Sequence, residues 1–309
     1  MADIFGVLLP VFALIFLGLA MRESGFPGND MWGPVNKLCY FILYPAMITS
    51  NLLRADLNQP DLIMGLGLSL VGSQLVMALI LLPLPKLFGV PGPKYSSVVQ
   101  GAVRWNGFIA LGIIAAMLGD SGLTLAAIAL GFMVPVANIL SVTIVAASSG
   151  QAPSLPQLGM LLLKNPLLIA CAVGTGLNLS GIGLWQPAIG LLDILSDASI
   201  SIGLIAIGAG LYFEGIKGDI GLIVLTTVLK LFGMPLLAAI GMTYMGVTGE
   251  TFVVGIVCTA VPGATSSYIL AQQLGGDARL MAALITVGTL ISIITMPAIL
   301  DYTLRYVGM

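Results

Sequence analysis

A cation and an amide stand two residues apart, at Arg104 and Asn106, inside an otherwise apolar stretch at about residues 95–118. Ionisable groups at bilayer depth are costly unless they face protein or water, so they often mark substrate pathways. The planar guanidinium of Arg104 suits a carboxylate, and the Asn106 amide offers donors and an acceptor. Gly107 weakens the helix at this point. Two alternatives stay open: polar packing between helices, and a guanidinium that snorkels toward water.

A second interruption lies far downstream, in another apolar stretch. Pro262 lacks an N–H and Gly263 lets the chain bend, so the pair is expected to break a helix. The freed backbone groups, with the hydroxyls of Thr265, Ser266 and Ser267, could contact a ligand. The alternative is ordinary helix packing by small residues.

Four further polar residues lie inside apolar stretches. Asn138 and Ser141, about one turn apart, are expected on one helix face and could complete a polar pocket. Lys230 could release its proton when desolvated and stand in for a coupling cation. Alternatively, its amine binds carbonyls freed by a broken helix. Gln74 could support the same site.

Asp193 and Asp197 lie four residues apart and should share a helix face. Two carboxylates this close would not both ionise easily in a dry site, which suggests a proton or cation site. The alternative is a hydrated helix face near the extracellular end.

The composition requires a membrane around these residues. Of the 309 residues, 58% are hydrophobic and 8% charged, and the mean hydropathy is +1.09; soluble domains carry about 25% charged residues. The net charge is −2 with no basic tract, which gives nucleic-acid binding no support. The chain has no histidine and only three isolated cysteines. Ser-His catalysis and imidazole metal sites are therefore excluded, and we expect no cofactor or metal.

Apolar runs separated by turn residues predict an all-α integral membrane protein with ten transmembrane helices. A polar break at 148–154 divides the chain into five-helix halves, 1–149 and 150–309. The expected spans are 4–22, 35–53, 62–84, 95–118, 122–147, 157–178, 187–212, 219–245, 252–274 and 279–303.

The two halves carry similar features at matching positions. Trp32-Gly33-Pro34 opens the second span, and Trp185-Gln186-Pro187 opens the seventh. The fourth and ninth spans are both interrupted, and the third and eighth each hold one mid-span polar group. Because five is odd, the second half must enter from the opposite side of the membrane. This pattern predicts inverted repeats whose substrate site lies where the broken helices meet.

Basic residues in the short loops predict the orientation. Loops after even-numbered spans and the two ends hold only Arg54 and Arg305, which places both termini outside the cytoplasm. The first apolar run, 4–21, has no basic residue before it and no small-residue cleavage site, so we expect it to be retained. Loops after odd-numbered spans hold seven basic residues: Arg22, Lys37, Lys86, Lys94, Lys164, Lys217 and Arg279.

Several motifs resemble those of the auxin efflux carrier family of bacterial membrane transporters, over essentially the whole chain. The fourth- and fifth-span motifs are the most specific. The motifs are Leu8-Leu9-Pro10-Val11-Phe12 with Gly18, Tyr44-Pro45-Ala46, Arg104-Trp105-Asn106-Gly107, Val134-Pro135-Val136-Ala137-Asn138-Ile139-Leu140-Ser141-Val142, and Pro262-Gly263-Ala264 with Ala271.

The resemblance implies a ten-helix fold shared with plant PIN auxin carriers and bile-acid sodium symporters. In that fold, helices 1, 2, 6 and 7 form a scaffold, and helices 3–5 and 8–10 form a moving core. The broken fourth and ninth helices cross at the midplane. The resemblance also implies a homodimer formed through the scaffold and contact with membrane lipid. The long cytoplasmic loop of plant members is absent here.

The leading hypothesis is a secondary transporter of a small organic anion in the cytoplasmic membrane, such as an auxin-like carboxylate or a dicarboxylate. It would work by elevator-type alternating access, proton-coupled or uncoupled. A sodium-coupled symporter of the bile-acid type is the alternative. The ninth span has no acidic residue at its break, and Lys230 adds positive charge, which disfavours sodium. An intramembrane enzyme, a channel or a sensor is the alternative from another class. Aspartyl proteolysis would need facing helices, whereas Asp193 and Asp197 share one.

Overall fold

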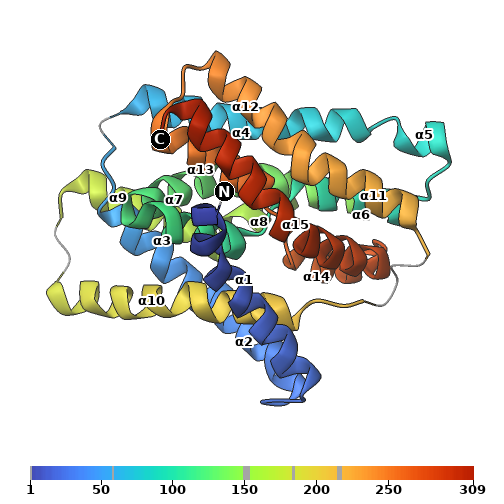
Figure 1. Ribbon diagram of the computed structural model, residues 1–309, viewed down its shortest axis with the longest axis horizontal. Helices are drawn as coiled ribbons and strands as arrows, with labels where there is room; N and C mark the ends of the chain where they lie inside the picture. Colours follow the sequence, from blue (N-terminus) through green and yellow to red (C-terminus); the bar gives the residue numbers. More distant parts are fainter. Residues whose placement is uncertain (1, 58, 149–153, 183–184, 214–217) are drawn as a thin grey trace.

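The protein is described by a computed structural model that covers residues 2–57, 59–148, 154–182, 185–213 and 218–309 (Figure 1). Within these ranges all regular structure is helical, with no strand. The expected midpoint break falls largely on residues 149–153, and Lys217 of the charge count also lies outside the described residues.

The helices follow in this order: α1 (Ala2–Glu23), η1 (Asn29–Met31), α2 (Trp32–Leu38), η2 (Cys39–Leu43), α3 (Tyr44–Leu53), α4 (Pro60–Leu81), α5 (Leu84–Phe88), α6 (Gly92–Val103), α7 (Gly107–Ser148), α8 (Leu155–Leu163), α9 (Pro166–Ser180), α10 (Gln186–Ala209), α11 (Ile220–Val228), η3 (Leu229–Gly233), α12 (Met234–Tyr244), α13 (Gly249–Ala260), α14 (Ser266–Leu274) and α15 (Ala278–Val307).

Six helical segments of the described chain are long and apolar enough to cross a membrane. They are Ile4–Glu23, Pro60–Phe88, Gly92–Ser148, Gln186–Ala209, Ile220–Tyr244 and Ala278–Val307. The pair α8 and α9, bent by 61° at residues 164–165, adds a seventh if counted as one span. The protein is therefore a multi-pass membrane protein, as its composition predicts.

The long helix α7 cannot be a single crossing. It has 42 residues, which would extend about 63 Å as a straight helix, whereas the hydrocarbon core is about 30 Å thick. Gly119 interrupts it with non-helical angles of φ 60° and ψ −143°. A residue with a Cβ rarely adopts this positive φ, so the glycine permits the turn expected between the spans 95–118 and 122–147.

Close glycine contacts hold α1 against α10, which runs across the lower left of the molecule in Figure 1. A Cβ added to Gly18 of α1 would lie 1.9 Å from the Ile205 carbonyl oxygen, and one on Gly208 of α10 would lie 1.8 Å from that of Ile15. Only glycine allows this backbone approach. Between these helices and α4 and α12, at the opposite edge of the view, lie α6, α7 and α13–α15.

Two π-helical turns, η2 and η3, interrupt helices that the sequence predicts as regular spans. Each precedes a proline, Pro45 in α3 and Pro235 in α12. Proline has no N–H for the carbonyl four residues earlier, and its ring clashes with that carbonyl. The wider π turn accommodates the missing bond and places Lys230 inside η3.

Candidate functional site

Two interrupted helices meet at their breaks. The first break, residues 104–106, separates α6 from α7, and the second break, residues 261–265, separates α13 from α14. Arg104 and Val261 leave their helices in almost the same extended conformation, with φ −77° and ψ 153° against φ −68° and ψ 155°. The Asn106 backbone N–H donates to the Pro262 carbonyl oxygen at 2.9 Å. A direct backbone hydrogen bond therefore joins the two breaks.

The Arg104 guanidinium connects three parts of the site. Its Nη1 donates to Oδ1 of Asn138 at 2.9 Å and to Oγ of Ser141 at 3.4 Å, and its Nη2 donates to Oγ of Ser266 at 3.0 Å. The first two acceptors lie on α7 and the third at the start of α14. Among the described residues, no carboxylate pairs with this guanidinium, and its buried Nε has no partner. The charge is held by neutral oxygens, which suits an incoming anion.

Asn106 caps the helix that follows the first break. Its Oδ1 accepts from the Ile109 backbone N–H at 3.3 Å, so Nδ2 is the free side of the amide. Asn106 is 2% exposed, and Nδ2 has no partner in the part of the chain that the structure describes. The N-terminus of α7, beginning at Gly107, also carries partial positive charge. An unpaired donor and a helix N-terminus therefore coincide.

The second break contributes backbone more than side chains. Pro262 presents its carbonyl to Asn106, and Gly263 approaches the backbone of α6, where an added Cβ would lie 3.2 Å from the Gly101 carbonyl oxygen. Thr265 precedes α14 at its N-cap position. The Ser267 hydroxyl is buried and has no partner among the residues described.

Lys230 and Gln74 both lie beside the last turn of α6. Lys230 is 2% exposed, and its Nζ has no hydrogen-bond partner within the described ranges. It borders a cavity of about 10 Å³ together with Gly101, Gly263 and Thr227, which is about the space of one water molecule. The Gln74 Nε2 reaches the Val103 carbonyl oxygen at 3.5 Å, a long contact.

The acidic pair on α10 has other surroundings. Asp193 accepts from Arg54 at 2.7 Å and from Ser50 at 2.8 Å, and its side chain is 40% exposed. Asp197 is exposed on the same helix. The structure therefore places Asp193 in an ion pair between α10 and the end of α3. Among the described residues, no group of three or more His, Cys, Asp or Glu is arranged to hold a metal ion.

Three buried polar residues near the breaks escaped the sequence reasoning. Gln100 on α6 is fully buried, and neither of its amide atoms has a partner in the described ranges. Thr227 lines the cavity beside Lys230. Tyr44, buried at the start of α3, has an unpaired hydroxyl within the same ranges. Gln100 lies in an apolar stretch, as Gln74 does, and Thr227 lies three residues before Lys230, so both carried a readable signal. Tyr44 belongs to the Tyr44-Pro45-Ala46 motif, but that motif did not mark its hydroxyl as part of a site.

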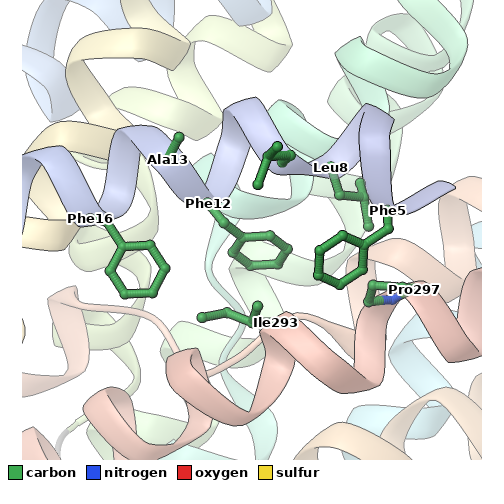
Figure 2. A pocket seen from close by; sticks show the side chains of 8 residues that line it. Phe5, Leu8, Phe12, Ala13, Phe16, Ile293 and Pro297 are labelled. Atoms are coloured by element: carbon green, nitrogen blue, oxygen red, sulfur yellow. The ribbon is translucent and has the colours of Figure 1, made fainter. Parts of the chain in front are cut away.

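A groove of about 460 Å³ between α1 and α15 has a different character. In Figure 2, the rings of Phe5, Phe12 and Phe16 point from α1 toward Ile293 and Pro297 on α15. Its lining side chains are all apolar and offer an anion no donor. The polar groups that could bind an anion lie at the two breaks instead.

Likenesses to known proteins bear on the class of protein to which this chain belongs. A family model described as "Membrane transport protein" matches residues 152–300. The chain is 24% identical to an "Uncharacterized transporter" of Methanothermobacter thermautotrophicus over 94% of this chain and 95% of the relative. It is 26% identical to a "Putative malonate transporter" of Rhizobium meliloti over 99% and 97%, respectively. The family and both names point to a transporter and not an enzyme. These likenesses indicate that the protein is a membrane transporter.

Proposed function

We propose that the protein is a secondary transporter of small carboxylates and that the carboxylate binds where the two breaks meet. The observation that carries this proposal is the Arg104 guanidinium, which is hydrogen-bonded only to neutral oxygens among the described residues. A charge at this depth is stabilised when an anion binds beside it. The unpaired Nδ2 of Asn106 and the N-terminus of α7 add donors to the same place.

The substrate class follows from the same groups. A guanidinium fork binds both oxygens of one carboxylate, and Asn106 can donate to it. The hydroxyls of Ser266 and Ser267, at the start of α14, can serve a second polar end. The Rhizobium meliloti relative, which is similar along nearly its whole length, carries a name that refers to malonate. We therefore propose short mono- and dicarboxylates as substrates.

The transport mechanism rests on a proposed division into ten crossings. They are α1, α2–α3, α4, α6 with α7 up to Gly119, the rest of α7, α8 with α9, α10, α11–α12, α13 with α14, and α15.

Two sets of contacts support inverted halves at 1–149 and 150–309. Crossing 1 corresponds to crossing 6 in the other half, and crossing 7 corresponds to crossing 2. A contact between crossings 1 and 7 should therefore have a counterpart between crossings 6 and 2. Both are present, because α1 packs on α10 and α9 packs on α3. The two breaks, in crossings 4 and 9, also share one backbone conformation. Crossings 1, 2, 6 and 7 would form a scaffold and a homodimer interface. The other six would move as an elevator, in the cytoplasmic membrane with both termini outside.

Lys230 and Gln74 are the residues we propose for coupling. A lysine amine without a partner among the described residues, beside a water-sized cavity, can exchange a proton or occupy the place of a cation. Asp193 is a weaker candidate because it already pairs with Arg54, and Asp197 is exposed.

The proposal is tested by reconstituting the full chain in proteoliposomes and measuring uptake and counterflow of acetate, malonate and succinate, with pH and sodium varied independently. We expect saturable carboxylate transport that falls about 100-fold or more in Arg104→Gln, because a charged hydrogen-bonding partner is lost. Arg305→Gln, at an exposed arginine on α15, is the matched control and should transport normally. Lys230→Met should abolish transport driven by a pH gradient and leave counterflow active.

Three results would contradict these proposals. If no carboxylate is transported, or if Arg104→Gln transports as well as Arg305→Gln, the binding site is wrong. A strict sodium requirement would instead support a symporter of the bile-acid type and remove Lys230 from the coupling mechanism.

A further inference from the structure

Tyr44 lies over the point where α7 begins. It is the first residue of α3, directly after the π turn η2, and it is only 3% exposed. Its ring packs on Phe108 of α7 with the ring centroids 4.5 Å apart. An added Cβ on Gly107 would lie 2.0 Å from the Tyr44 hydroxyl oxygen. The hydroxyl therefore touches the N-terminus of α7 at Gly107, where there is no side chain to exclude it.

This hydroxyl has no hydrogen-bond partner among the described residues. Buried hydroxyls are nearly always paired, because an unpaired one loses its bonds to water and gains nothing in return. Asn106 Nδ2, one residue before Gly107, is the second unpaired buried donor at this place. Two donors from different helices, Tyr44 on α3 and Asn106 before α7, thus adjoin one helix N-terminus.

We propose that Tyr44 is a further substrate-binding residue, whose hydroxyl donates a hydrogen bond to the carboxylate held by Asn106 and Arg104. This inference rests on the proposed function and deepens it. A carboxylate is acceptor-only and has two oxygens, so it can take donors from both sides of the α7 N-terminus. Gly107 is then required for space, because any side chain would displace the hydroxyl.

The placement also connects the scaffold to the substrate. Tyr44 belongs to the second proposed crossing, in the scaffold, whereas Arg104 and Asn106 belong to the core. When the core moves, Tyr44 must separate from Gly107, so its hydrogen bond to the carboxylate exists on one side of the transport cycle only. Loss of the hydroxyl therefore weakens binding from one face of the membrane more than from the other.

Tyr44→Phe separates a binding role from a structural one, because the ring and its packing remain. We expect the apparent KM for malonate to rise about 10-fold from one face of the membrane, the effect of one hydrogen bond to a charged group. The midpoint of thermal unfolding without substrate should stay the same or rise, because an unpaired buried hydroxyl is removed. The control is Tyr244→Phe, at an exposed tyrosine ending α12, which should change neither quantity.

The experiment uses the full chain, with transport in proteoliposomes of known orientation and thermal unfolding in detergent. An unchanged KM in Tyr44→Phe, while Arg104→Gln loses transport, would overturn the role of Tyr44 and leave the proposed function standing. A lower unfolding midpoint with an unchanged KM would assign the hydroxyl a structural role and also overturn it. If the wild-type protein neither binds nor transports carboxylates, both proposals fail together.

Discussion

The first and second breaks share a backbone conformation but differ in the chemistry they offer. The first break presents the side chains of Arg104 and Asn106, whose donors are partly unpaired among the described residues. The second presents the Pro262 carbonyl and packs Gly263 against the backbone of α6. We infer that the first break binds the anion through its side chains. The second break supplies the backbone carbonyl that holds the first break in place.

The neighbours of the breaks differ in the same way. The first is covered by a side chain, Tyr44, which touches Gly107, and the second by main chain at Gly101. A side chain can be shortened by substitution without moving the main chain, whereas a close contact between two backbones leaves little room for an added atom. Side-chain substitutions at the first break should therefore mainly alter affinity, and those at the second break should cause a modest loss of stability. Gly107 is an exception, because a side chain there would clash with Tyr44 and lower stability strongly.

The largest expected effect is at that exception. Gly107→Ala places a Cβ 2.0 Å from the Tyr44 hydroxyl oxygen, whereas Gly263→Ala places one 3.2 Å from the Gly101 carbonyl oxygen. Overpacking of the first kind costs about 1–3 kcal/mol or more, and we expect about 1 kcal/mol or less for the second. Thermal unfolding in detergent should show the larger loss for Gly107→Ala.

A double substitution identifies the cause of that loss. Tyr44→Phe removes the hydroxyl, so the nearest ring atom, Cζ, lies 3.0 Å from the new Cβ. Gly107→Ala should then lower the unfolding midpoint less in the Tyr44→Phe background than in the wild type. Equal losses in both backgrounds would show that the contact with Tyr44 does not explain the glycine.

Smaller effects, on the KM for malonate, are expected from the side chains that hold Arg104 at the first break. Asn138→Ala removes the shortest hydrogen bond from Arg104, at 2.9 Å, and should raise the KM for malonate about 10-fold. Ser141→Ala removes a contact of 3.4 Å and should raise it less. The two residues lie on one helix, so each serves as the matched comparison for the other in the same transport assay. A greater effect for Ser141→Ala would contradict the hydrogen-bond geometry.

The smallest effect is expected away from both breaks. Asp193→Asn breaks the ion pair with Arg54. The side chains of both residues are well exposed, and exposed ion pairs contribute about 0–1 kcal/mol to stability. We expect a slightly lower unfolding midpoint and carboxylate transport within about twofold of the wild type, on the scale of that free energy. Asp197→Asn, on the same helix without a described ion pair, is the control. A large transport defect confined to Asp193→Asn would instead indicate that the Asp193 side chain takes part in coupling.

The sequence by itself determined the membrane class, most helix positions and the identity of the polar residues in the apolar stretches. A polar group in hydrocarbon is costly, so Arg104, Asn106 and Lys230 stand out wherever they lie in the fold. Turn residues also act locally, which is why the bend at Gly119 was predicted from the sequence alone. The substrate and coupling roles assigned to these residues stay predictions.

Only the tertiary structure decided which of these groups meet. The hydrogen bond from Asn106 to Pro262, the hydroxyl of Tyr44 above Gly107, and the pairing of Asp193 with Arg54 each join segments far apart in the chain. The two π turns were not predicted either, because each lies inside a continuous helix and its sequence carries no local break beyond one proline. Local sequence sets the cost of burying a group, but only packing sets its partner.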